Sequence, residues 1–112
     1  MTFPNISTTG LYLEAEVVSN KQQGFETRYQ AATGSTISPG SPQAYQSQNN
    51  KWGAELRIYF NDTTIESTLR ASGLTVETHN SGYKSGEFSF RVNNNDFWWF
   101  LVESLGATIG QN

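Results

Sequence analysis

The chain contains no cysteine and a single histidine, His79. Without cysteine there are no disulfide bonds, no thiolate zinc sites and no thiol nucleophiles. One histidine, expected at the edge of a loop, does not make a metal site among scattered glutamates. No Ser-His-Asp arrangement, phosphate-binding loop or dinucleotide fingerprint stands in the sequence. We therefore expect neither a metal nor a cofactor.

Charged residues are also scarce, at 15% of the 112 residues, and the formal net charge is -3. A general nucleic-acid-binding protein needs a basic surface that displaces counterions from the phosphate backbone. The acidic balance of this chain argues against such a partner, so no nucleic acid is expected.

Long apolar runs are absent too, since the longest one, at 97–102, spans six residues. A helix that crosses a bilayer needs about 20 apolar residues, so no membrane span is expected. The first residues show neither the basic region nor the apolar region of a secretory signal. Together these observations predict a cytoplasmic protein.

What the chain does have is a large share of aromatic residues, 13%, within a hydrophobic fraction of 36%. The length fits one domain with a modest core, so we interpret residues 1–112 as a single α+β domain. Residues 34–50 contain two prolines and two glycines among Ser, Gln and Asn. Such a segment cannot build a core, and it predicts a long, mobile loop.

Alternation of apolar and polar residues marks the predicted strands, at 11–18, 25–31, 52–60, 74–78, 87–92 and, more briefly, 107–109. The first two are interpreted as a β-hairpin with a long turn. In the strand at 87–92, Phe88, Phe90 and Val92 are expected to face the core, with Arg91 on the opposite side.

The first of two short predicted helices opens at 61–63 and stops at Gly73, a residue suited to the left-handed end of a helix. Thr63 and Glu66 have the spacing of a capping box, in which each side chain satisfies a backbone amide of the first turn.

The second predicted helix covers 97–105 and stops at Gly106, with Asn95 or Asp96 as its cap. Asp62 stands in the same way at the start of the first helix. Capping therefore explains both aspartates, because a side-chain oxygen at that position accepts bonds from amides of the first turn.

These elements predict a two-layer sandwich: a mostly antiparallel sheet, two short helices on its apolar face, and an open face that is charged. Residues 55–76 and 87–109 share one plan, a strand, a cap, a short helix and a β-prone tail. Two such units would give a ferredoxin-like βαββαβ arrangement preceded by the hairpin. A plain antiparallel meander under the same helices is the alternative.

The charged face mixes glutamates with arginines, which is typical of a solvated sheet surface with cross-strand ion pairs. The alternative is a ligand-binding or acid–base site on that face. Its candidate residues lie on the polar side of the predicted strands: Glu14, Glu16, Glu55, Arg57, Tyr59 and Arg91.

Four consecutive rings, at 97–100, begin the last predicted helix. One helix has room for a single core stripe. Trp99 and Phe100 are therefore expected to be partly exposed, unless the hairpin or the long loop covers them. Exposed tryptophan is enriched at interface hot spots, so these two residues are the candidate interface.

In the absence of a reactive constellation, the sequence favours a non-enzymatic binding or interaction module. It would bind a protein partner or a second copy of itself, as a homo-oligomer, through the aromatic helix or the charged face. A small enzyme or ligand-binding domain with its site on the polar sheet face is one alternative. A small phage or mobile-element accessory protein that inhibits a host system is another.

Overall fold

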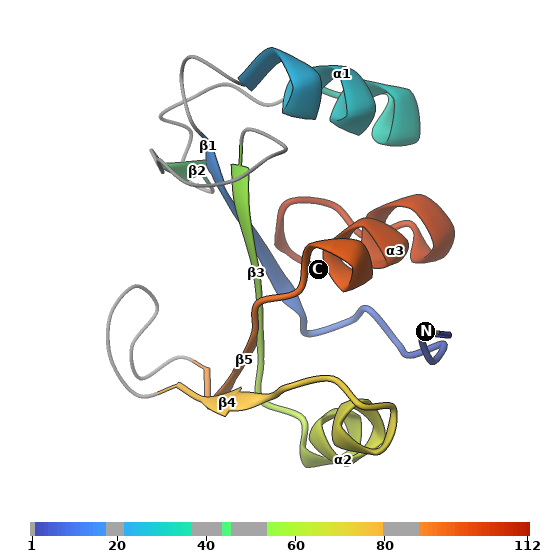
Figure 1. Cartoon of the computed structure of the whole chain (residues 1–112), viewed down its shortest axis with the longest axis vertical. Helices are drawn as coiled ribbons and strands as arrows, with labels where there is room; N and C mark the ends of the chain where they lie inside the picture. Colours follow the sequence, from blue (N-terminus) through green and yellow to red (C-terminus); the bar gives the residue numbers. More distant parts are fainter. Residues whose placement is uncertain (1, 18–21, 37–43, 46–53, 80–87) are drawn as a thin grey trace.

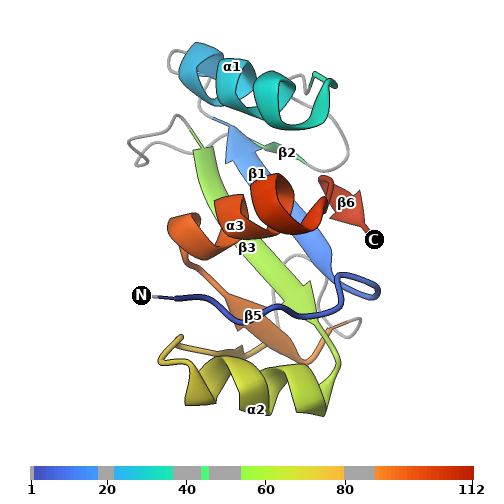
Figure 2. The same ribbon diagram turned by 90° about the vertical axis from the view of Figure 1, so that its right-hand side faces the viewer.

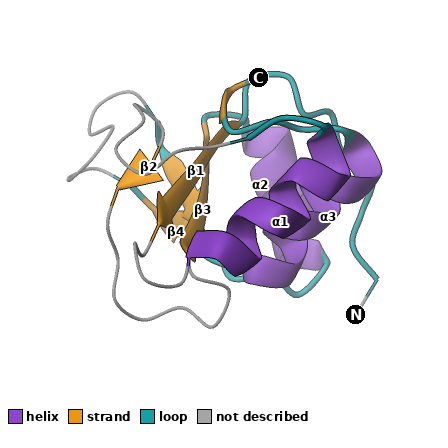
Figure 3. Cartoon of the chain, turned by 90° about the horizontal axis from the view of Figure 1, so that it is seen from above, coloured by secondary structure: helices purple, strands orange, loops and turns teal. Residues whose placement is uncertain are grey.

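The computed structural model describes residues 2–17, 22–36, 44–45, 54–79 and 88–112, and Figure 1 shows how they are arranged. Within these ranges the chain has an α+β architecture, with a mostly antiparallel sheet. Its elements are β1 (Tyr12–Val17), α1 (Gln22–Thr33), β2 (Ala44–Tyr45), β3 (Ala54–Phe60), α2 (Thr63–Ala71), β4 (Glu77–Thr78), β5 (Phe90–Val92), α3 (Asn95–Leu105) and β6 (Gly110–Gln111). All of these helices lie on one side of the sheet (Figure 3), as the predicted two-layer class requires.

The sheet has the strand order β2-β1-β3-β5-β4, with β6 paired to β1. The central pair, β1 and β3, is antiparallel along its whole length, from Tyr12 opposite Tyr59 to Val17 opposite Ala54. β5 is antiparallel to both β3 and β4. The other edge of β1 is shared by β2, which is parallel to it, and β6, which is antiparallel.

This topology does not confirm the ferredoxin-like arrangement. A βαββαβ sheet would place its last strand directly beside its first, which here means β6 beside β3. The last strand does form, slightly later than predicted, but it pairs with β1, and β1 itself lies next to β3. β1, which precedes the two repeated units, therefore lies beside β3, where the last strand of a ferredoxin-like sheet would lie.

The predicted N-terminal hairpin is wrong, because residues 25–31 belong to α1. Phe25 and Tyr29 are both buried, and their spacing of four residues fits one face of a helix. The same two residues also fit the alternating pattern of a strand, so a segment with so few apolar residues cannot distinguish the two periods. The part of the chain that the structure describes accordingly has three helices instead of the two that were expected.

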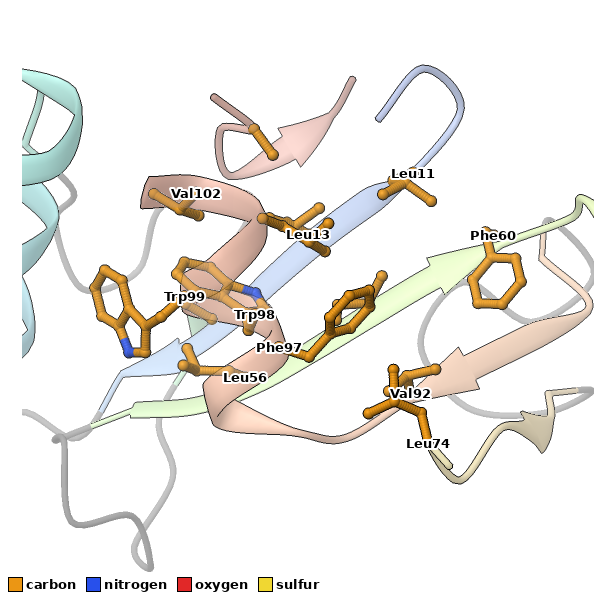
Figure 4. Packing of buried hydrophobic residues seen from close by; sticks show 14 of the residues in the cluster. Leu11, Leu13, Leu56, Phe60, Leu74, Val92, Phe97, Trp98, Trp99 and Val102 are labelled. Atoms are coloured by element: carbon orange, nitrogen blue, oxygen red, sulfur yellow. The ribbon is translucent and has the colours of Figure 1, made fainter. Parts of the chain in front are cut away.

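The core lies between the sheet and α3, which crosses β1 and β3 (Figure 2). The strands contribute Leu13, Leu56 and Ile58, and α3 contributes Trp98 and Leu101. Each of these side chains is at most 1% exposed. Figure 4 shows Trp98 over the two strands, between Leu13 and Leu56. Burying one such side chain contributes about 1.5–3 kcal/mol. The predicted apolar phase of the two long strands is thereby confirmed.

The start of α2 is capped by Asp62, whose Oδ1 accepts hydrogen bonds from the amides of Thr64 at 2.8 Å and Ile65 at 3.1 Å. The predicted capping box is wrong, since Glu66 instead accepts a bond from Arg70 one turn further along. An aspartate at the N-cap satisfies the same first-turn amides that a threonine at the next position was expected to reach.

The cap of α3 is Asn94, whose Oδ1 accepts the amide of Phe97 at 2.9 Å. The predicted caps, Asn95 and Asp96, lie one and two residues inside the helix. The helix ends as predicted at Gly106, which has a φ of 74°, a backbone conformation that glycine adopts without strain. Most of the predicted loop at 34–50 lies outside the described residues; its described part includes β2.

Candidate functional site

The face of the sheet away from the helices is not the open surface that the alternation suggested. Glu14 in β1 is 0% exposed, and Tyr59 in β3 is 2% exposed. The side chain of Arg57, the neighbour of both, is 15% exposed. Alternation assigns residues to a face, but it does not say whether that face is covered, and this is why the expectation of a solvated surface is wrong here.

Glu14, Arg57 and Tyr59 form a hydrogen-bonded group at the centre of this face. Glu14 and Arg57 stand directly opposite each other in the register of β1 and β3. Arg57 Nη1 donates to Glu14 Oε1 at 3.1 Å, and the Tyr59 hydroxyl donates to the same oxygen over a longer 3.4 Å. A carboxylate removed from water needs such compensation.

Burial, together with the negative charge of Glu14, raises the pKa of Tyr59 to about 12. The phenol therefore keeps its proton at neutral pH and acts as a hydrogen-bond donor. It is not a candidate base.

A second ion pair, on the neighbouring strands β5 and β4, lies next to this group. Arg91 in β5 lies opposite Tyr59, and Glu77 in β4 lies opposite Arg91. Arg91 Nη2 donates to Glu77 Oε2 at 3.0 Å, and both of these side chains are partly exposed. Both of these ion pairs thus join side chains of neighbouring strands on this face.

Three further aromatic rings, those of Tyr12, His79 and Phe88, lie close to the ring of Tyr59. The His79 ring lies 4.8 Å from that of Tyr59, and Phe88 lies 5.7 Å from Tyr12 and 6.1 Å from Tyr59, measured between ring centroids. His79 directly follows β4, and its side chain is buried. We call the set made of Tyr12, Glu14, Arg57, Tyr59, Glu77, His79, Phe88 and Arg91 the polar-face cluster.

The position of Phe88 corrects another expectation. Phe90 and Val92 pack on the helix side as predicted, but Phe88 turns to the opposite face, where it joins Tyr12 and Tyr59. The chain bends at Ser89, whose amide donates to Asn61 Oδ1 at 2.6 Å, and β5 begins only at Phe90. This bend interrupts the alternation from which the orientation of Phe88 was inferred.

Four of the candidate ligand-binding residues are therefore brought together by the structure: Glu14, Arg57, Tyr59 and Arg91. Glu16 and Glu55 face each other in the register of β1 and β3, but their side chains lie outside the described part of the structure. The four that are described bind one another and Glu77. Their chemical role in this arrangement is to hold the sheet and its aromatic neighbours in place.

A cavity of about 360 Å³ opens beside the cluster, at the end of β3. We call it the end pocket. Its apolar wall consists of Leu11, Phe60, Ile65 and Phe88. Its polar lining consists of Thr9, Asn61, Asp62 and Gln111, together with the backbone at Gly10. Four parts of the chain that are far apart in sequence thus meet around one space.

The walls of the end pocket are fixed by hydrogen bonds and ring contacts. Gly10, at a φ of 86°, turns the chain into β1, and its amide donates to the carbonyl of Asn112 at 2.9 Å. The amide of Asn112 in turn donates to the carbonyl of Leu11 at 2.9 Å. Phe88 is held by the rings of the polar-face cluster. The cluster therefore supports one wall of the pocket.

Trp99, half of the candidate interface, is buried, and the expectation that it would be exposed is wrong. It is 2% exposed, because α1 covers it. The Phe25 ring lies 5.4 Å away, and the Arg28 guanidinium carbon lies 4.3 Å above the indole. Arg28 also makes two hydrogen bonds to Glu103 of α3, at 2.8 and 2.9 Å. The segment that was expected to be a hairpin covers this residue as a helix.

Phe100, the other candidate interface residue, is half-buried. Its ring lies 5.5 Å from that of Phe3 and 6.2 Å from that of Phe97. Part of this ring remains accessible, so Phe100 still offers a small aromatic contact at the surface.

Comparison with known proteins gives no match: no family model, no curated protein and no solved structure is similar to this chain. Among the described residues, no helix has both the length and the apolar character needed to cross a bilayer. The same residues hold no group of three or more His, Cys, Asp or Glu side chains placed to bind a metal ion.

Sequence reasoning did not find the end pocket. It interpreted Asp62 as a helix cap, which is correct, and residues 1–9 as a loose lead-in. The pocket exists because that lead-in, the end of β3, Phe88 and β6 meet in space. Nothing in the local sequence of these four segments signals that meeting.

Proposed function

We propose that this protein is a non-enzymatic binding domain that takes a small ligand in the end pocket. The observation that carries this proposal is a cavity of about 360 Å³ whose lining is about equally apolar and polar. Ligand sites in proteins begin at about 300 Å³ and combine apolar surface with polar groups that orient the ligand. A ligand of one ring with a short side chain suits a site near that lower limit.

Binding is favoured over catalysis by the state of the ionisable groups. Glu14 is fully buried and bonded to Arg57, and Tyr59 keeps its proton. Of the described residues that line the pocket, Asp62 is the one with an ionisable side chain, and its Oδ1 caps α2. General acid–base catalysis needs a group that reaches the substrate and exchanges a proton near neutral pH. The described lining of the pocket holds no histidine, cysteine or lysine for this role.

The test is a titration of ¹⁵N-labelled protein with three small aromatic probes: phenol, 2-phenylethanol and 2-phenylethylamine. We expect saturable amide shifts at Gly10, Asn61, Ile65 and Gln111. A Gln111→Trp variant, in which the new ring fills an exposed lining position, should abolish them. Ser104→Trp adds the same ring at an exposed site of α3 away from the pocket and should leave them intact.

Two results would count against the proposal. One is the absence of saturable shifts with all three probes. The other is binding that Gln111→Trp and Ser104→Trp affect equally, since the probes would then lie elsewhere.

Self-association is a second proposal, and after the burial of Trp99 it rests on Phe100. The accessible ring of Phe100 lies beside Phe3, which is also half-buried, and exposed aromatic residues are enriched at interfaces. A homo-oligomer or a protein partner would use this contact. The cytoplasmic location and the accessory-protein alternative stay predictions from the sequence.

A further inference from the structure

We propose that the end pocket selects small organic cations, in which an ammonium group is attached to an aromatic or aliphatic body. This inference rests on the binding function proposed above and names its ligand class. The described lining of the pocket carries one formal charge, the carboxylate of Asp62, and its other side chains are neutral. The argument has three parts: the carboxylate, the lack of a matching cation in the lining, and the aromatic wall.

The carboxylate of Asp62 is held in place and remains able to accept further bonds. Its two hydrogen bonds, from the amides of Thr64 and Ile65, both go to Oδ1. An ionised carboxylate offers about four acceptor positions on its two oxygens, so capping and ligand binding are compatible. The cap also fixes the orientation of the group before a ligand arrives, which lowers the ordering cost of binding.

The charges near the pocket disfavour an anion. No lysine or arginine is among its described lining residues. On the neighbouring sheet face, Arg57 and Arg91 are bonded to Glu14 and Glu77. The N-terminus of α2 carries a partial positive charge of about half a unit, which offsets only part of the charge of Asp62. An anionic ligand would therefore meet net negative charge from the described lining residues.

The apolar wall suits the body of such a ligand. Phe60 and Phe88 bring two aromatic rings to the pocket, and Leu11 and Ile65 add aliphatic surface. Burying apolar surface favours binding in proportion to its area. A cation placed near the face of an aromatic ring gains a further attraction. An aromatic ring on a short alkylammonium chain uses both features at once.

The experiment compares three probes with the same ring and different head groups: 2-phenylethylamine, 2-phenylethanol and phenylacetate. Dissociation constants come from amide shifts of the full chain. We expect the amine to bind about two- to fivefold more tightly than the alcohol, the range that an exposed ion pair supplies, and phenylacetate to bind most weakly. Raising the salt concentration should reduce the preference, because exposed charges are screened.

Two variants locate the preference. Asp62→Asn removes the charge but keeps the cap, since asparagine caps helices as well as aspartate does, so the amine and the alcohol should then bind equally. Glu66→Gln removes a neighbouring charge of α2 that does not line the pocket, and the wild-type ratio should persist.

The outcomes separate this inference from the function on which it rests. If the alcohol binds as tightly as the amine, or if Asp62→Asn leaves the ratio unchanged, the ligand class is wrong while the pocket remains a binding site. If phenylacetate binds most tightly, the charge argument is reversed and fails. If none of the three probes shifts the amides of the lining residues, the binding function and the ligand class fail together.

Discussion

Replacing Arg57 by methionine would remove the guanidinium that neutralises Glu14 while keeping most of the aliphatic stem. Glu14 is fully buried, and Arg57 Nη1 lies 3.1 Å from its Oε1. Removing one partner of a fully buried pair costs about 3–5 kcal/mol, because the other charge remains without compensation. Here the Arg57 side chain is 15% exposed and Tyr59 still donates to the same oxygen. We therefore expect a loss of about 2–4 kcal/mol in the free energy of unfolding.

The assay is urea unfolding followed by tryptophan fluorescence, which reports on the buried indoles of Trp98 and Trp99. The matched control is Arg70→Met. Arg70 makes an ion pair of similar length, with 3.0 Å between its Nε and Glu66 Oε2. This pair lies on the exposed face of α2, where the Arg70 side chain is 49% exposed. Exposed pairs of this kind contribute about 0.3–0.5 kcal/mol, so this variant should unfold almost like the wild type.

A double-mutant cycle completes the test. Glu14→Gln removes the buried charge itself, so adding it to Arg57→Met should recover part of the stability that the single variant loses. The reasoning is refuted if Arg57→Met costs no more than Arg70→Met. It is also refuted if the effects of Arg57→Met and Glu14→Gln simply add, because the two side chains would then not be coupled.

Four further predictions concern other parts of the molecule. Trp99→Ala should lower the free energy of unfolding by about 3–5 kcal/mol and leave the mass measured by light scattering unchanged; a changed mass would contradict the burial of this ring under α1. If the wild type is an oligomer, Phe100→Ser should lower the mass measured by light scattering, and an unchanged mass would show that the interface lies elsewhere. Asp62→Ala should cost about 0.5–2 kcal/mol and Asp62→Asn only a few tenths; equal losses in urea unfolding would argue against capping. Because burial, together with the charge of Glu14, raises the pKa of Tyr59 from 10.0 to about 12, its contribution to stability is complete below pH 10 and is lost as the pH rises towards 12. Tyr59→Phe should flatten that part of the stability profile, and an unchanged slope would contradict the shift.

The sequence predicted those elements whose periodicity is unambiguous. β1 and β3 alternate over six and seven residues, and their apolar phase, seen at Leu13 and Ile58, is the one that faces the helices. α2 and α3 were expected from their apolar spacing and from the glycines that follow them. In α1, by contrast, Phe25 and Tyr29 fit a strand as well as a helix, and the packing of Phe25 against Trp98 and Trp99 of α3 is not visible in the local sequence.

The candidate site was predicted in part. The alternation grouped Glu14, Arg57, Tyr59 and Arg91 on one face, and the structure places them there together. It could not show that the face is covered, because burial depends on segments elsewhere in the chain. The orientation of Phe88 and the end pocket were not predicted either, because a bend before β5 and the meeting of four distant segments leave no local pattern in the sequence.

The hydrogen bonds that join Gly10 and Leu11 to Asn112 have a practical consequence for how the protein is prepared. Gln111 lines the end pocket, and Asn112 is bonded to the turn beside it. An affinity tag fused after Asn112 would therefore leave the fold at the mouth of the pocket, where its own side chains could occupy the site or shield Asp62. Binding measurements are best made with the tag removed or attached elsewhere, and a ligand preference that depends on the tag would belong to the tag.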